Sequence, residues 1–223
     1  MNARLSPKLL GLLTAAALLT ACGGQRSLIA VKESGDRAYD RANSDAALVD
    51  YQEFVERLPG DPTGRFRLGR TYLKLGRPLQ AREQLFIAHS QNVDDDEVAE
   101  ALAESLYAAG QHEDLYKLLR NRALDRGEIE DYLRLAHFAQ RTGDADEARQ
   151  ALLTAARLDK GKSPAVQMEL VNFFESIGDR DSALERLRMA YYLAPSDGKI
   201  KDRIRAYGDV PGPSFAVRPP EQE

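Results

Sequence analysis

The sequence predicts an all-α protein built from repeated pairs of helices. Four glycines, each expected to end one helix, recur at spacings of 34, 33 and 35 residues: Gly76, Gly110, Gly143 and Gly178. Five residues after each of them stands a small or apolar residue, in turn Ala81, Leu115, Ala148 and Ala183. The chain also contains no Trp and is rich in Ala, Leu, Arg and Glu, a composition that favours helices over sheets.

The small residues have a physical role in this pattern, because two helices approach closely only where Ala or Gly replaces a bulky side chain. Leucines nine residues after each glycine are expected to fill the space between units: Leu85, Leu119, Leu152 and Leu187. The pattern resembles the tetratricopeptide repeat, a helix-turn-helix unit of about 34 residues. This resemblance implies a right-handed α-solenoid of about four to five units over residues 35–197.

Two units depart from the pattern. Around Gly110, Arg122 stands where a buried Ala is expected, and Leu115 replaces the usual small residue. We therefore expect the second helix of this unit to be displaced, or its interface with the next unit to be looser. The N-terminal unit has a good second helix but only a short and poor first helix, which we place at Ser34–Ala42.

Several helix starts carry their own signals. Asp61-Pro62 and Ser163-Pro164 place a capping side chain before a proline suited to the first helical position. Asp144 with Glu147 predicts a capping box. The acidic run 94–97 lacks the alternating oxygen ligands and central Gly of a calcium loop, so we interpret it as the start of a helix, where carboxylates favour the free N–H groups.

The N-terminus predicts an export signal. Arg4 and Lys8 precede an apolar run from Leu9 to Leu19, which is shorter than the ~20 residues that span a bilayer as a helix. The quartet that ends at Cys22 resembles the lipobox of bacterial lipoproteins, in which the Cys is acylated and becomes the first mature residue. Within that family, the Gly23 that follows implies an outer-membrane anchor that faces the periplasm. The protein then contacts the membrane through acyl chains on Cys22.

The C-terminal end predicts two further segments. Lys199–Tyr207 has apolar residues at helical spacing and is expected to cap the last unit, whereas the final stretch has four prolines and few apolar residues. The chain is therefore divided into a signal peptide (1–21), a lipidated tether (22–34), a repeat solenoid (35–197), a capping helix (198–208) and a disordered Pro-rich tail (209–223).

Composition and motifs argue against several function classes. Without Arg4 and Lys8, 29 basic residues remain against 35 acidic ones, a formal net charge of −6 that disfavours nucleic acid. The three histidines lie in different units without metal-ligand spacing, and no nucleophile elbow or phosphate-binding loop is recognisable. We therefore predict a protein that is not an enzyme, with no metal, cofactor or small-molecule substrate.

Binding of protein partners is the better prediction. In tetratricopeptide repeats the first helices of successive units line a concave groove that accepts partner segments. The resemblance places these residues in such a groove: Phe66, Arg70, Lys74, Glu104, Tyr107, His137, Arg141, Met168 and Asn172. This groove is mixed in charge, which suits an amphipathic segment. The clamp that holds a C-terminal carboxylate in chaperone-binding members is not reproduced, because Glu100 and Glu104 stand where cations are needed.

Lipobox, size and repeats together resemble the pilot lipoproteins of type IV and tight-adherence pili, which bind a secretin subunit and aid its assembly. The expected function is thus a scaffold for assembly of an envelope complex, foremost in pilus or secretin biogenesis. An adaptor for peptidoglycan enzymes or for outer-membrane barrel assembly would share every feature above and remains the alternative.

Overall fold

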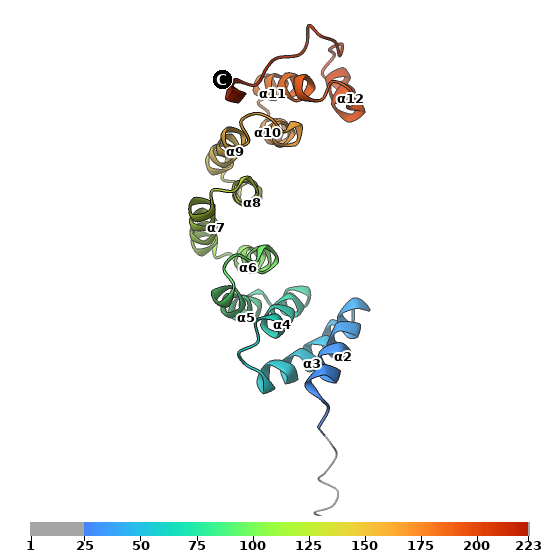
Figure 1. The fold of residues 1–223 in the computed structure, drawn as a ribbon, viewed down its shortest axis with the longest axis vertical. Coiled ribbons are helices and arrows are strands. Elements are labelled where there is room, and N and C mark those ends of the chain that lie inside the picture. Colours follow the sequence, from blue (N-terminus) through green and yellow to red (C-terminus); the bar gives the residue numbers. More distant parts are fainter. Residues whose placement is uncertain (1–24, 223) are drawn as a thin grey trace, which may run out of the picture. The chain divides into compact units, whose positions relative to one another are not determined.

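The computed structural model describes residues 25–222, so the predicted signal peptide and Cys22 lie outside the described residues. Within this range the chain forms eleven α-helices and a short 3-10 helix, Pro220–Gln222, and no β-strand (Figure 1). The all-α prediction is confirmed. The chain divides into two compact parts, each made of several repeats. From here on, we call Met1–Val98 the first unit and Ala99–Glu223 the second unit.

The first unit consists of two helical hairpins. Their helices are α2 (Leu28–Asp40), α3 (Ser44–Arg57), α4 (Pro62–Lys74) and α5 (Pro78–Gln91). A core of buried residues from α3 and α4 joins the two hairpins: Ala47, Leu48, Tyr51, Val55 and Leu68. The predicted cap at Asp61 is confirmed, because its carboxylate accepts a hydrogen bond from the backbone N–H of Gly64.

The predicted boundary between the tether (22–34) and the first helix (Ser34–Ala42) was wrong. Helix α2 begins at Leu28, within the segment assigned to the tether, because the hydroxyl of Ser27 caps it by accepting from the N–H of Ala30 and because Val31 is buried. The turn after α2 has Ala42 at φ +58°, where later units have glycine. Ala42 lies 34 residues before Gly76, so the period extends into this unit without its glycine.

Close helix crossings in this unit depend on small residues. A Cβ atom added to Gly69 on α4 would lie 2.5 Å from Cγ of Leu85 on α5. Gly35 on α2 faces the ring of Tyr51 on α3 in the same way: a Cβ atom added to Gly35 would lie 2.8 Å from the nearest atom of that ring. The expected role of small residues at helix crossings is therefore seen directly at Gly69, which precedes Gly76 by seven residues.

The second unit continues the hairpin pattern. Its helices are α6 (Asp96–Ala108, whose first turn precedes the division), α7 (His112–Arg126), α8 (Ile129–Thr142), α9 (Ala145–Asp159), α10 (Pro164–Ser176), α11 (Arg180–Leu193) and α12 (Gly198–Ala206). The repeat glycines Gly76, Gly110, Gly143 and Gly178 all have positive φ, between +67° and +80°, which costs glycine nothing. The pattern of turns is thus confirmed.

The helix caps follow the sequence with one exception. Ser163 caps α10 through the N–H of Val166, and Asp95 caps α6 through the N–H groups of Glu97 and Val98, as the acidic run predicted. Asp144 accepts from the N–H of Glu147 at the start of α9. The side chain of Glu147, however, pairs with Arg120 rather than returning to Asp144, so only half of the predicted capping box forms.

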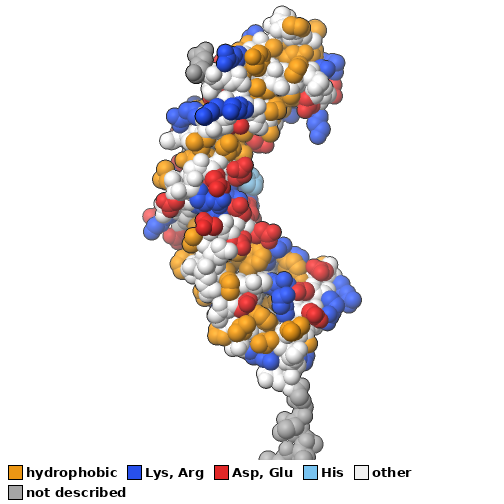
Figure 2. Space-filling view, in the orientation of Figure 1, with side chains coloured by type: hydrophobic (Ala, Val, Ile, Leu, Met, Phe, Trp, Pro, Cys, Tyr) orange, Lys and Arg blue, Asp and Glu red, His pale blue; other side chains and the backbone are white. Residues whose placement is uncertain are grey.

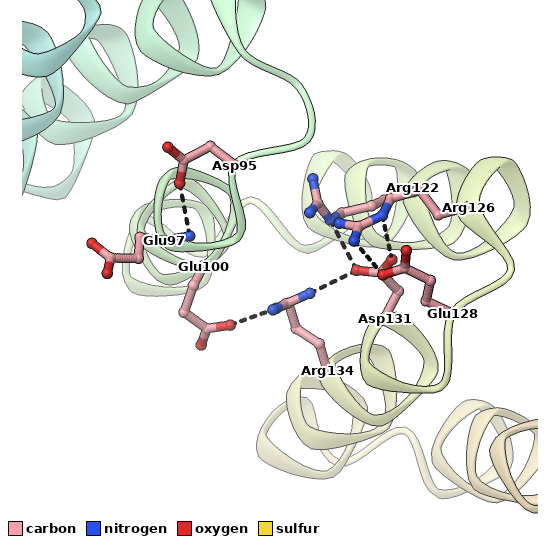
Figure 3. A network of polar contacts seen from close by, with 8 residues as sticks. All are labelled: Asp95, Glu97, Glu100, Arg122, Arg126, Glu128, Asp131 and Arg134. Carbon is pink, nitrogen blue, oxygen red and sulfur yellow. Dashed lines mark hydrogen bonds and ion pairs between the residues drawn. The ribbon is translucent and has the colours of Figure 1, made fainter. Parts of the chain in front are cut away.

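The predicted weakness around Gly110 was wrong. Helix α7 is well packed, with Leu115 and Leu119 buried, and Arg122 is only 5% exposed. Its Nε donates a 2.9 Å hydrogen bond to Oδ1 of Asp131 on α8, which is 2% exposed (Figure 3). A buried ion pair therefore takes the place of the expected Ala.

The prediction of a disordered tail at residues 209–223 was also wrong for the described part, 209–222. Phe215 is buried in a cluster formed by α10, α11 and α12, and its ring meets that of Tyr191 edge-on. The tail's prolines restrict the unfolded chain and so reduce the entropy lost when this segment becomes ordered. Helix α12 packs against α10 and α11 through the buried Ile200 and Ile204.

Every helix between residues 25 and 222 is too short or too polar to cross a lipid bilayer.

Candidate functional site

A cleft of about 580 Å³ opens in the first unit between α2 and α4. Three elements supply most of its lining: Asp36, Tyr39 and Asp40 from α2, Tyr51 from α3, and Thr63, Phe66, Arg67 and Arg70 from α4, with Glu97 also at its edge. Two of the residues predicted to line a groove, Phe66 and Arg70, therefore border an open space. Lys74, one turn further along α4, lies next to them.

Aromatic rings hold the cations of this cleft in place. Nζ of Lys74 lies 3.3 Å from the centroid of the Tyr39 ring. The guanidinium of Arg70 lies between two rings, 5.4 Å from the Tyr39 centroid and 5.3 Å from that of Phe66. Such cation–π contacts orient a charge without neutralising it. Among the described residues, neither Arg70 nor Lys74 forms an ion pair with a carboxylate.

One of the three acidic residues that line the cleft, Asp36, is neutralised from within. Asp36 forms an ion pair with Arg67 and accepts a 2.7 Å hydrogen bond from the hydroxyl of Tyr51. Burial raises the pKa of Tyr51 to about 12, so the hydroxyl remains a donor at neutral pH. Burial, with the nearby charge of Arg70, lowers the pKa of Arg67. The cleft therefore presents Arg70 together with Asp40, Glu97 and the ring of Phe66, and Lys74 lies beside it over the ring of Tyr39.

In the second unit, the predicted residues Glu104 and Arg141 bind each other. The two guanidinium nitrogens of Arg141 on α8 bond both carboxylate oxygens of Glu104 on α6, one of them at 2.8 Å. This hydrogen-bonded pairing lowers the pKa of Glu104 and raises that of Arg141. The same guanidinium lies 4.0 Å from the centroid of the Tyr107 ring. These three side chains join neighbouring helices, and their charges are internally satisfied.

The remaining predicted residues have different surroundings. His137 is exposed and its ring contacts that of Phe138, with 5.5 Å between centroids. Met168 packs against the apolar cluster at the C-terminal end of the unit. Oδ1 of Asn172 accepts a 3.0 Å hydrogen bond from Arg203 on α12. Of the nine predicted groove residues, Phe66 and Arg70 line this cleft, and Lys74 lies beside it over the ring of Tyr39.

Tyr39 was missed in the sequence, although it supplies the ring under both cations. It lies 34 residues before Leu73, which lies 34 residues before Tyr107, so all three share one position of the repeat. The period alone could have found it. The first repeat was not recognised in full because Ala42 replaces the glycine that marks the turn in the later repeats.

The described side chains offer no group of three or more His, Cys, Asp or Glu that could hold a metal ion. Figure 2 shows acidic and basic side chains interspersed over the face in view.

Comparison with known proteins agrees with the hairpin geometry. The tetratricopeptide repeat is the family that matches, over residues 132–162, which comprise most of α8 and all of α9. The fold is that of the tetratricopeptide repeats. A tetratricopeptide-repeat protein of Thermus thermophilus has the same fold at 22% identity and a TM-score of 0.50, with 81% of this chain and 98% of that chain covered.

Two further structures share the tetratricopeptide-repeat fold. MamA from Desulfovibrio magneticus RS-1 aligns with a TM-score of 0.58 at 15% identity, over 77% of this chain and 97% of that chain. PilF of Pseudomonas aeruginosa aligns with a TM-score of 0.55 at 16% identity, over 82% of this chain and 85% of that chain. No curated protein gives a significant match to the sequence. At these identities the likeness concerns the fold alone.

Proposed function

We propose that this protein is a non-enzymatic, lipid-anchored scaffold that faces the periplasm and assists assembly of an envelope complex, foremost a pilus or its secretin. The observation that carries the proposal is the cleft between α2 and α4, where Arg70 and Lys74 are held against aromatic rings without a carboxylate partner. Arg and aromatic side chains dominate protein interfaces, and here the chain orients both before a partner arrives.

The expected partner segment follows from the chemistry of this cleft. Arg70 and Lys74 favour a carboxylate, whereas the faces of Phe66 and Tyr39 favour an apolar or aromatic side chain beside it. Asp40 and Glu97 at the edge disfavour a segment that carries only negative charge. The partner segment is thus amphipathic, with a carboxylate close to an apolar residue.

The envelope assignment is supported by two observations outside the cleft. The lipobox that ends at Cys22 favours a lipid anchor, and Gly23 favours the outer membrane. The sequence resemblance to pilot lipoproteins, with a fold shared by PilF of Pseudomonas aeruginosa, favours a role in pilus assembly. An anchored scaffold of this size would hold the cleft near the inner surface of the outer membrane.

Affinity capture from envelope membranes tests the proposal. Wild-type protein is compared with Arg70→Ala/Lys74→Ala, and with the control Arg77→Ala/Lys117→Ala, which removes one Arg and one Lys from exposed positions outside the cleft. We expect the cleft variant to recover a secretin or pilus component at least tenfold less than the wild type, and the control to recover it fully. Equal recovery by both variants would place binding elsewhere. Capture of cell-wall hydrolases or barrel-assembly proteins would favour the adaptor role.

A further inference from the structure

The described C-terminal residues, 209–222, form a segment that folds back along α11, with a turn at residues 212–215 and the 3-10 helix Pro220–Gln222 at its end. Figure 1 shows this segment leaving α12 and ending beside α11. We call it the C-terminal strap. Its backbone is tied to α11 at two points: the N–H of Val217 donates to the carbonyl of Arg188 at 3.3 Å, and Nε of Arg188 donates to the carbonyl of Phe215 at 2.9 Å. Residues 215–217 of the strap are thus bound through their backbone, as a peptide ligand would be.

One aromatic side chain anchors the strap. Phe215 fills an apolar pocket whose walls come from three helices: Val171 of α10, Leu187, Ala190 and Tyr191 of α11, and Ile200 and Ile204 of α12. These wall residues are buried in the folded chain, and Phe215 completes their cluster. Ala216 packs against the same cluster, and Pro219 is buried as well, so Phe215 is the largest of several apolar contacts of the strap.

A carboxylate six residues later forms the second anchor. Oε1 of Glu221 lies 2.5 Å from Nη1 of Arg186, and the same nitrogen donates to Oε1 of Gln167 at 3.1 Å. Gln167 is fully buried, yet its Nε2 has no hydrogen-bond acceptor among the described residues, and Oε2 of Glu221 has no donor. The strap therefore leaves one donor of its own binding site unused.

The binding site extends beyond the second anchor. A cleft of about 470 Å³ runs along α9 beside Glu221, and its wall is formed by Asp146, Arg149, Gln150, Leu153 and Arg157. Two arginines and one leucine thus continue the pattern of apolar and cationic contacts that the strap already uses. A segment longer or more acidic than the strap would gain contacts here.

We infer that the surface formed by α9, α10 and α11 is a peptide-binding site that the C-terminal strap occupies in cis. In trans it accepts an extended partner segment with an aromatic residue and a carboxylate about six positions later. A partner carboxylate that accepts from both Arg186 and Nε2 of Gln167 satisfies the donor that the strap leaves unused. Further acidic residues pair with Arg149 and Arg157. This site is separate from the cleft between α2 and α4, so it does not depend on the function proposed above.

The segment before Phe215 allows the strap to leave without unfolding the helices. Gly208 has φ +90°, and the stretch from Gly208 to Ser214 contains two glycines and two prolines in which Val210 is 82% exposed. A tethered strap competes at a high effective concentration, so a partner needs the additional contacts along α9 to displace it. The strap accordingly acts as a gate that selects for segments richer in acidic residues.

Binding of a labelled peptide to the full chain tests this inference. The probe is a fluorescent peptide of residues 209–223, measured by anisotropy against the wild type, the weakened-strap variant Phe215→Ala/Glu221→Gln, and the control Val210→Ala. We expect the weakened-strap variant to bind the probe at least tenfold more tightly than the wild type or the control. A probe in which the phenylalanine is replaced by alanine should lose at least tenfold in affinity. Adding Arg186→Ala to the weakened-strap variant should also lower its affinity for the original probe at least tenfold.

Equal probe binding by the wild type and a weakened-strap variant with unchanged circular dichroism would overturn the inference. Hydrogen exchange of the wild type is a second test that requires no variant: the amide of Val217 should exchange at least tenfold faster than that of Leu187 in α11. Equal rates would mean that the strap opens only when the unit unfolds, which also contradicts it. A dimer in sedimentation of the weakened-strap variant mixed with wild type would identify a second copy as the occupant and overturn the assignment to a partner.

Discussion

Nε of Arg122 donates to Oδ1 of Asp131 across the turn between α7 and α8, and both side chains are buried. Asp131 also pairs with Arg126 at 3.4 Å and with Nη1 of Arg134 at 2.7 Å, and Arg134 in turn reaches Glu100 on α6 (Figure 3). A buried acid thus holds three arginines from two helices. The repeat around Gly110 is therefore joined to the following helix α8 by charge, at the position where an Ala crossing was expected.

This ion pair predicts a strong effect on stability. Asp131→Ala should lower the free energy of unfolding by about 3–5 kcal/mol, because it leaves buried guanidinium groups uncompensated. Arg122→Ala should also destabilise, but less, since Asp131 keeps Arg126 and Arg134 as partners. Chemical denaturation of the two single variants and the double variant measures their coupling. Purely additive losses would mean that the pair does not interact.

Gly69 predicts that a single methyl group disturbs the crossing of α4 and α5. Gly69→Ala should destabilise by about 1–3 kcal/mol, because overpacking against Leu85 exceeds the gain in helix propensity. Gly198→Ala is the matched control, since a Cβ there would meet no atom within 4 Å. Its midpoint in thermal denaturation should be unchanged or slightly higher. If both variants melted alike, the crossing would have room for a methyl group after all.

The pairing of Glu104 with Arg141 predicts that the folded protein loses stability as the pH falls into the acid range. The folded protein lowers the pKa of Glu104, and Arg203 does the same for Glu175, so both groups stabilise the fold above the unfolded pKa near 4.5. This contribution is lost as the pH falls through the lowered, folded-state values. Glu104→Gln should therefore be less stable than the wild type at pH 7, and the difference should shrink between about pH 5 and pH 3.

Urea denaturation at a series of pH values measures this effect. Glu169→Gln on α10 is a suitable control, because Glu169 is exposed and lies outside these pairs. Its stability should run parallel to that of the wild type across the whole range. A constant difference between Glu104→Gln and the wild type at every pH would exclude the ion pair as its cause.

The proposed lipidation of Cys22 predicts a covalent label. Since Cys22 is the one Cys in the sequence, Cys22→Ser should abolish incorporation of radiolabelled palmitate and leave the precursor unprocessed. Thr20→Ala keeps a small residue in the lipobox and should be labelled like the wild type. Labelling of Cys22→Ser at the wild-type level would exclude this residue as the anchor.

The candidate site was only partly predictable. The sequence placed Phe66, Arg70 and Lys74 on one face of a first helix, and the cleft between α2 and α4 is consistent with that. It also assigned Arg141 to a binding surface, whereas the structure pairs it with Glu104, 37 residues earlier. Which charge is satisfied internally depends on the neighbouring unit, and that partner follows from no local pattern.

The sequence by itself determined most of the helices, the glycine turns and the caps at Asp61, Ser163 and Asp144, because these depend on interactions between residues a few positions apart. A glycine that ends a helix or an Asp before a proline at a helix start has the same effect in any context. Only the tertiary structure decided that Arg122 is buried on Asp131, that Tyr39 underlies two cations, and that the Pro-rich tail is held by Phe215 and Glu221. Each of these contacts joins different elements, so it forms only when the fold brings those elements together.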